Sequence, residues 1–241
     1  LMAGPPGSGR TTTCYSALTY LNTPEKAVYS FEPEIRYQIE GVLQGKPEPR
    51  YEYGYLDGVR ATLDLEPDVF YIGDLNGEDV ARLAVGAAFG KRIVLGRLNA
   101  KNGATALMSL LDMGLAPFLV TSGVVGVVSQ RLVRRLCEAC RQPYVPSETV
   151  LTELSLNPNP ELKFYSATGC DECEQSGFKG KIGLFEVLVL SETVQEKVLA
   201  RASAAEIQEA AVESGMMTLR LDGVSKVTRG LTTIEEVLAA T

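Results

Sequence analysis

A glycine-rich loop near the start of the chain constrains its fold more than any other feature. It reads Gly-Pro-Pro-Gly-Ser-Gly-Arg-Thr from Gly4 to Thr11, and it connects the apolar residues 1–3 to a run of helix-forming residues that begins at Arg10. Glycines let backbone N–H groups turn toward phosphate oxygens, and the helix that follows presents the positive end of its dipole to the same anion. The loop therefore predicts a phosphate site at a strand-to-helix connection of an α/β domain.

Seven residues of this loop are expected to bind nucleotide, and they are Gly4, Gly7, Ser8, Gly9, Arg10, Thr11 and Thr12. Thr11 supplies the hydroxyl that a phosphate loop offers to Mg²⁺. Arg10 stands where such loops have lysine, and a planar guanidinium does not reproduce a compact ammonium group. The alternative interpretation is a Gly/Pro turn before a helix, with no connection to nucleotide.

Strand and helix patterns alternate along residues 1–98, which is typical of a mostly parallel α/β sheet. Short apolar runs predict strands at 27–32, 37–44, 69–72 and 93–98. Helix-forming runs predict helices at 10–21, 55–65 and 78–89. The last fifty residues show helical periodicity in three pieces, each with a polar cap and an early acid, which begin near Ser191, Ser203 and Thr233.

Two acidic residues at predicted strand ends are the candidate catalytic groups. Asp74 follows the apolar run at 69–72, where an acid in a phosphate-loop protein lies beside magnesium or polarises water. Glu32 ends the strand at 27–32 and could reach the same crevice, because α/β sheets bind ligands at the carboxyl ends of their strands. The alternative for Glu32 is a solvated strand end.

Four of the five cysteines form two Cys-x-x-Cys pairs, which are Cys137 with Cys140 and Cys170 with Cys173. Four thiolates can surround zinc tetrahedrally, and such a site has no open position, so it is structural. Disulfides and redox motifs are the alternatives. No secretory signal supports disulfides, and two redox motifs in one small lobe would be unusual.

Composition excludes several classes of function. The chain of 241 residues contains no histidine, so it has no histidine base, no Ser–His triad and no histidine metal ligand. Its net charge of −7 argues against nucleic-acid binding. No stretch approaches the roughly 20 apolar residues of a membrane helix.

Six segments resemble the ATPases that drive type II secretion and type IV pilus assembly, and they are 4–13, 21–26, 66–74, 130–140, 170–181 and 230–237. The resemblance covers nearly the whole chain. It implies a RecA-like core at 1–135, a zinc lobe with four cysteines at 136–190 and a small helical lobe at 191–241. It also implies a cytoplasmic homo- or hetero-hexamer that associates with the inner membrane through a platform protein. Because the chain begins at Leu1 with only a strand end, we expect the rest of that strand and a further domain to precede it.

Several positions depart from the family pattern that this resemblance implies. Arg10 replaces the lysine of the loop, and Asp74 replaces the catalytic glutamate. The two family histidines are Arg92 and Asn99 in this chain, and the arginine that follows the acid is lost. The second arginine of the helix that carries Arg60 is also missing. We therefore expect a degenerate member that binds nucleotide with weak or no ATP hydrolysis and has a structural or regulatory role. The alternatives are an active motor and an interaction module without nucleotide.

Overall fold

The computed structural model describes residues 1–48, 54–154 and 162–241, and it divides the chain into two compact units. Unit 1 consists of Leu1–Ser129 and Val187–Met216, and unit 2 consists of Gln130–Glu186 and Met217–Thr241. Neither unit is a continuous stretch of sequence, so the chain passes between the units three times. The three consecutive lobes expected from the sequence, 1–135, 136–190 and 191–241, stay a prediction.

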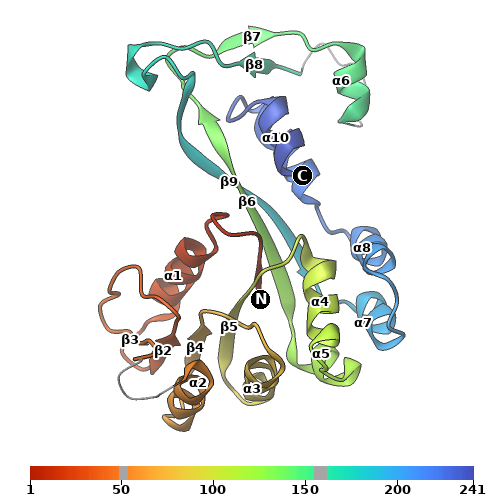
Figure 1. Ribbon diagram of the computed structural model, residues 1–241. Coiled ribbons are helices and arrows are strands. Elements are labelled where there is room, and N and C mark those ends of the chain that lie inside the picture. Colours follow the sequence, from red (N-terminus) through yellow and green to blue (C-terminus); the bar gives the residue numbers. More distant parts are fainter. Residues whose placement is uncertain (49–53, 155–161) are drawn as a thin grey trace. The chain divides into compact units, whose positions relative to one another are not determined.

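The strands β1 to β5 of unit 1 form one sheet with β6 and β9, two strands that continue into unit 2, and the neighbouring pairs of β1 to β6 that are described run parallel (Figure 1). The order across the sheet is β3-β2-β4-β5-β1-β6-β9. The strands are β1 Met2–Ala3, β2 Val28–Phe31, β3 Leu43–Gly45, β4 Val69–Ile72, β5 Ile93–Leu98, β6 Gly126–Leu136 and β9 Phe178–Val189. Neighbouring parallel strands end at one edge, so the residues that follow β1, β2, β4 and β5 gather there.

Side chains on alternate positions of β4 enter two different cores, because successive residues of a strand point to opposite faces. Phe70 and Ile72 belong to one apolar cluster, and Val69 and Tyr71 belong to another that includes Leu18. All four β4 residues are buried, which accounts for the continuous apolar run in the sequence.

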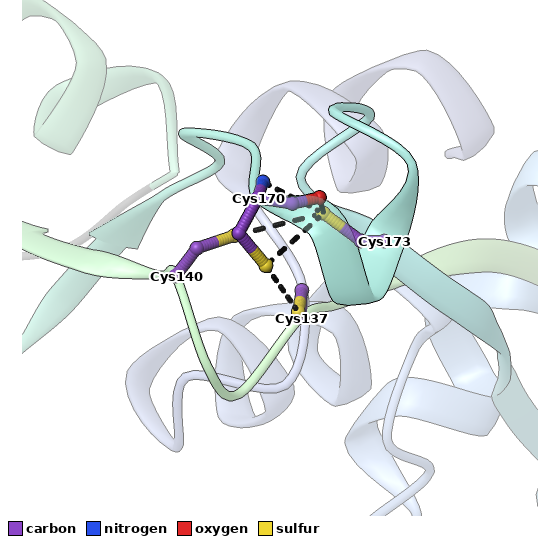
Figure 2. Close-up of side chains that lie close together, drawn as sticks. All are labelled: Cys137, Cys140, Cys170 and Cys173. Atoms are coloured by element: carbon purple, nitrogen blue, oxygen red, sulfur yellow. Dashed lines mark hydrogen bonds between the residues drawn. The ribbon is translucent and has the colours of Figure 1, made fainter.

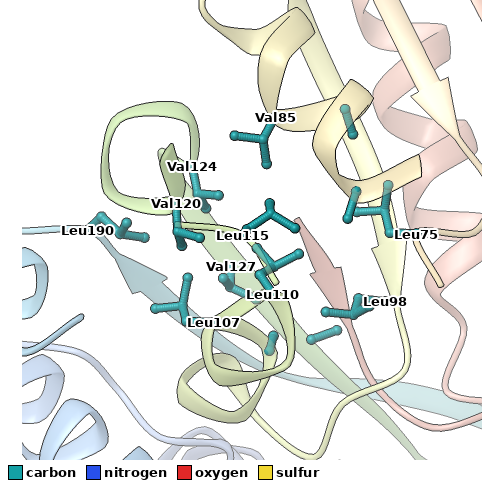
Figure 3. Packing of buried hydrophobic residues seen from close by; sticks show 14 of the residues in the cluster. Leu75, Val85, Leu98, Leu107, Leu110, Leu115, Val120, Val124, Val127 and Leu190 are labelled. Carbon is teal, nitrogen blue, oxygen red and sulfur yellow. The ribbon is translucent and has the colours of Figure 1, made fainter. Parts of the chain in front are cut away.

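Helices cover both faces of this sheet, and those of unit 1 are α1 Arg10–Leu21, α2 Tyr55–Asp64, α3 Glu78–Ala88, α4 Gly103–Asp112, α5 Pro117–Gly123, α7 Glu192–Leu199 and α8 Ala204–Glu213. Figure 3 shows the larger core, in which Leu107 and Leu110 of α4 lie near Val120 of α5 and Val127 of β6. Val194 of α7 and Ile207 of α8 join the same cluster.

Unit 2 has its own apolar cluster and a two-stranded antiparallel sheet formed by β7 Gln142–Tyr144 and β8 Phe164–Ser166. Its helices are α6 Glu148–Glu153, α9 Leu219–Thr228, α10 Ile234–Ala240 and the 3-10 turn Asp171–Cys173. Arg134 links two parts of this unit, since its guanidinium pairs with Glu236 at 2.6 Å and lies 4.0 Å from the ring centre of Phe178.

The predicted α/β class with a mostly parallel sheet is confirmed. One expected strand is wrong over most of its length, since β3 covers Leu43–Gly45 and the expectation was 37–44. Gly41 has a φ of +79°, and the N–H of Val42 bonds the carbonyl oxygen of Ile39, so the chain turns where an extended strand was expected. None of the helices in the described ranges is long and apolar enough to cross a membrane.

Candidate functional site

The glycine-rich loop forms a tight turn at the first residue of α1. Gly7 and Gly9 have φ values of +79° and +87°, which glycine adopts without strain. The N–H of Ser8 donates to the carbonyl oxygen of Pro5 at 3.2 Å and closes the turn. The hydroxyl of Ser8, a residue only 4% exposed, has no hydrogen-bond partner among the described residues. This hydroxyl and the free N–H groups of the first turn of α1 are the donors a phosphate group needs.

The predicted nucleotide-binding residues follow one another around this turn. Gly4 comes directly after β1, Gly9 caps α1, and Arg10, Thr11 and Thr12 form the first turn of the helix. The acids lie at the same edge of the sheet, since Glu32 directly follows β2 and Asp74 lies two residues beyond β4. Parallel strands therefore gather the loop and both candidate acids at one edge.

The side chain of Arg10 is held by the protein itself. One of its guanidinium nitrogens, Nη1, donates to the carbonyl oxygen of Leu98, the last residue of β5, at 2.6 Å. Burial lowers the pKa of Arg10, the positive charge of Arg97 lowers it further, and the negative charge of Asp74 acts in the opposite direction. The cation of the loop thus lies among protein groups, with an acid and a second arginine near it.

Asp74 is half-buried and lies in a short network at the end of β4. Its carboxylate accepts a hydrogen bond from the N–H of Asn76 at 3.2 Å, and its own N–H donates to the hydroxyl oxygen of Tyr55 at 2.8 Å. The hydroxyl of Tyr55 in turn donates to the carbonyl oxygen of Phe31 at 3.1 Å. These bonds fix the backbone of Asp74 beside the end of β2.

Glu32 is only 2% exposed, and both of its carboxylate oxygens accept hydrogen bonds from buried hydroxyls. Tyr15 donates to one oxygen and Ser30 to the other, each at 2.8 Å. Burial raises the pKa of Glu32 above its ordinary value, and these two hydrogen bonds oppose that rise. A catalytic role for Glu32 stays a prediction.

We expect the stability of the Glu32→Gln variant to fall less than that of the wild-type chain as the pH rises from acid to neutral. A raised pKa means that the folded chain binds the Glu32 proton more tightly than the unfolded chain, so ionisation of Glu32 costs stability. Stability is therefore lost as the pH rises from the ordinary glutamate pKa through the raised one. The measurement is the free energy of unfolding in urea at a series of pH values from acid to neutral.

The exposed acid Glu40 provides the matched control for that experiment. Glu40→Gln removes the same charge, and it is expected to leave the pH dependence of unfolding close to that of the wild type. If the difference between wild type and Glu32→Gln stayed constant across the pH series, ionisation of Glu32 would not affect stability.

Arg97 is a site residue that the sequence interpretation missed. It lies in β5, and its guanidinium donates to the hydroxyl oxygen of Thr11 at 2.9 Å. Its charge also acts on Glu32, where it lowers the pKa. A charged residue inside the apolar run 93–98 was the signal that could have identified it. Of the two positions where the family has histidine, Arg92 lies just before β5 and Asn99 just after it, so only Asn99 is at the loop's edge of the sheet.

The four paired cysteines meet in unit 2, as Figure 2 shows. Their sulfur atoms all lie within 4.8 Å of one another, and three of the separations are 3.7, 3.8 and 3.9 Å. A zinc ion with sulfur ligands at about 2.3 Å has sulfur atoms about 3.8 Å apart when the geometry is tetrahedral. A disulfide needs a sulfur–sulfur distance of about 2.05 Å. The four thiols therefore could hold a metal ion such as zinc.

Backbone N–H groups around this cluster point at the sulfur atoms. Gly169 donates to Cys140 at 3.3 Å, and Gly177 donates to Cys173 at 3.2 Å. Burial raises the pKa of Cys173, but hydrogen bonds from the N–H groups of Cys170 and Gly177, together with those to the thiols of Cys170 and Cys140, lower it overall, which favours the thiolate. Gly169 has a φ of +112°, and a Cβ there would lie 2.7 Å from the carbonyl oxygen of Gln175, so the turn requires glycine. Cys14 does not belong to this cluster: it is a buried residue of α1 in unit 1.

Sequence comparisons place similar proteins in bacterial secretion and pilus systems. A family model described as Type II/IV secretion system protein matches residues 1–239. The type II secretion system protein E of Pseudomonas aeruginosa is 37% identical over 241 residues, which cover 100% of this chain and 48% of that protein. The type IV pilus assembly ATPase PilB of Thermus thermophilus is 36% identical, and the match covers 100% of this chain and 27% of PilB. The chain thus spans about half of these relatives or less.

Two solved structures share the fold. The pilus retraction motor PilT with bound ADP matches with a TM-score of 0.72 at 18% identity, over 100% of this chain and 60% of that one. The ATPase DotB of Legionella pneumophila matches with a TM-score of 0.68 at 18% identity, over 99% of this chain and 58% of that one. At this level of identity the likeness concerns the fold alone.

Proposed function

The chain belongs to the type II/IV secretion system protein family, and on that premise we propose that it binds nucleotide but hydrolyses ATP weakly or not at all. Its loop has the glycines, the helix N-terminus and, in Ser8, a hydroxyl without a partner in the described part of the chain, all of which phosphate binding uses. The role that follows is structural or regulatory, within a secretion or pilus machine.

The hydrogen bond from Arg10 to the carbonyl oxygen of Leu98 is the observation that carries this proposal. In phosphoryl transfer the cation of the loop stabilises negative charge on the phosphates, and each such group typically contributes orders of magnitude to the rate. Here that cation is a guanidinium that donates to the protein. The acid Asp74 is one methylene shorter than the family's glutamate, so its carboxylate reaches less far.

The cysteine cluster supports a structural zinc ion in the same protein. Cys137, Cys140, Cys170 and Cys173 would supply all four ligands, which leaves no position for a substrate. The metal would join the turn before β7 to the 3-10 turn Asp171–Cys173. The chemistry of the donors suits a soft or borderline ion, since sulfur is the ligand in every position.

Partners are proposed from the family alone. The chain would assemble into a homo- or hetero-hexamer in the cytoplasm and associate with the inner membrane through a platform protein. A hetero-hexamer would let this chain work beside an active ATPase subunit. The high content of acidic residues, with a net charge of −7, supports a protein partner in place of nucleic acid.

We expect saturable ATP binding with hydrolysis close to the background rate. The measurement is ATP affinity by calorimetry together with phosphate release, at a protein concentration that permits oligomers. Asp74→Asn is expected to change the affinity by no more than about threefold and to leave the low rate unchanged, since little chemistry depends on that acid.

Two outcomes would support the other functions. Clear ATP turnover that Asp74→Asn abolishes would establish an active motor. Failure to bind ATP at any magnesium concentration would leave an interaction module as the function. Glu78→Gln is the matched control, because Glu78 is an exposed acid four residues further along that pairs with Arg82.

A further inference from the structure

The hydroxyl of Thr11, the group expected to ligate Mg²⁺, is already bonded to a cation of the protein. Nη1 of Arg97 donates to Oγ1 of Thr11 at 2.9 Å. Thr11 is the second residue of α1, and Arg97 is the fifth residue of β5, so the contact joins segments 86 residues apart.

The sheet holds Arg97 in this position. Its backbone pairs with Met2 of β1, and its carbonyl oxygen accepts a hydrogen bond from the N–H of Leu75 at 3.0 Å. The next residue, Leu98, lies in the core on one face of the sheet, so Arg97 points to the opposite face, where α1 packs. The guanidinium therefore reaches the first turn of α1 from a fixed strand.

These residues do not fit a magnesium ion at the Thr11 hydroxyl. Mg²⁺ needs oxygen ligands at about 2.1 Å in octahedral geometry. An ion at that distance from Oγ1 would lie within about 5 Å of the guanidinium nitrogen that donates to the same oxygen, and like charges at that distance repel. Arg10 adds a second positive charge at the same end of the helix, since it lies near enough to Arg97 for the two charges to interact.

The same arrangement suits a polyanion. Two guanidinium groups lie near one helix N-terminus, and their mutual repulsion would be relieved by a negatively charged ligand between them. The buried Ser8 hydroxyl, without a partner among the described residues, gives a further donor inside the loop. Two acids lie near this pair of cations: the charge of Asp74 acts on Arg10, and the charge of Arg97 acts on Glu32, whose ionisation is disfavoured by burial.

We infer that the loop binds a nucleoside polyphosphate without a divalent cation, and that Arg97 supplies beside Thr11 the positive charge that Mg²⁺ supplies in other phosphate loops. This inference rests on the proposed nucleotide binding. Arg97 would contact the phosphate chain directly, and its charge, unlike that of a metal ion, would be present before the nucleotide binds.

The test is to titrate the full chain with ATP in excess Mg²⁺ and in excess EDTA. The dissociation constant in EDTA is expected to stay within about threefold of that in Mg²⁺, or to be lower. Arg97→Gln keeps a hydrogen-bond donor but removes the charge. It is expected to weaken binding in EDTA by about tenfold or more, and Mg²⁺ should recover most of that loss.

Two further variants keep the test decisive. Arg92→Gln removes the same charge at the opposite end of β5, and it is expected to bind ATP as the wild type does in both conditions. Arg97→Lys retains the charge and should keep most of the binding in EDTA, which distinguishes loss of charge from loss of fold. Circular dichroism and the thermal midpoint check that each variant is folded.

The results that would refute this inference differ from those that would refute the proposed function. Wild-type binding that requires Mg²⁺, or wild-type binding in EDTA that Arg97→Gln leaves unchanged, would overturn the role of Arg97 and leave nucleotide binding intact. If the Arg97→Gln chain did not fold, wild-type binding in EDTA and in Mg²⁺ would still decide whether the loop needs a divalent cation. Absence of binding in both conditions would refute the proposed function itself.

Discussion

Replacing Cys173 with serine is expected to remove the bound metal and to unfold most of unit 2. Cys173 accepts N–H bonds from Cys170 and Gly177, and its sulfur lies 3.7 Å and 3.8 Å from those of Cys170 and Cys140. In small metal-dependent domains, zinc contributes on the order of 10 kcal/mol to folding. That is comparable to the total stability of about 5–15 kcal/mol of a typical domain. Incubation with a strong zinc chelator is expected to have the same effect.

The measurements are metal analysis and calorimetric unfolding of fresh protein. Wild type is expected to contain about one equivalent of zinc, and the variant less than about half of that. Unfolding of the variant should show a separate early transition, because the two apolar clusters of unit 1 contain none of the ligands. Cys14→Ala is the control: it removes a buried thiol outside the cluster and should leave the zinc content unchanged. Wild-type protein without metal that unfolds in one late transition would refute the metal's structural role.

The second large expected effect is a gain of ATP hydrolysis when three residues of the proposed nucleotide site are exchanged. Arg10→Lys returns a compact cation, Asp74→Glu lengthens the acid, and Arg97→Thr frees the Thr11 hydroxyl for Mg²⁺. Groups that act together in catalysis contribute non-additively, so the double variant without Arg97→Thr should gain little. The triple variant is expected to exceed wild-type turnover by about a hundredfold or more.

Phosphate release at saturating ATP and Mg²⁺ measures this gain. The matched control carries Arg82→Lys and Asp79→Glu, the same two exchanges on the exposed face of α3, and should hydrolyse ATP no faster than wild type. A triple variant that binds ATP with Mg²⁺ and still fails to hydrolyse it would show that other positions limit the rate. Asn99, the family's histidine position at this edge of the sheet, would be the next residue to exchange.

Local sequence signals predicted the elements of the sheet well. The run at 69–72 is β4, and the helix expected from Arg10 to Leu21 is α1 with the same bounds. A continuous apolar run fixes a buried strand because both faces of a parallel sheet are covered. The cysteine spacing likewise predicted which four sulfur atoms would come together, since each pair lies on one short turn.

Features that depend on distant segments could not be read from the sequence. The contact between Arg97 and Thr11 joins residues 86 positions apart, and it depends on which strands are neighbours. The helix α9 was missed in a stretch where only three helices were expected, since its cap Thr218 is followed by no acid until Asp222. The sequence also did not show that residues 187–216 belong to unit 1, because this depends on their apolar contacts with α4 and α5.

Because the chain passes between the two units three times, the segments of each unit are synthesised at different times. The part of unit 1 that precedes residue 130 is synthesised before unit 2, but its core lacks Val194, Val198 and Ile207 until α7 and α8 have been made. By then all four paired cysteines, the last at position 173, have already been synthesised. Zinc can therefore assemble its site on the nascent chain before either core is complete, and the metal would be the first long-range link that the growing polypeptide makes in unit 2.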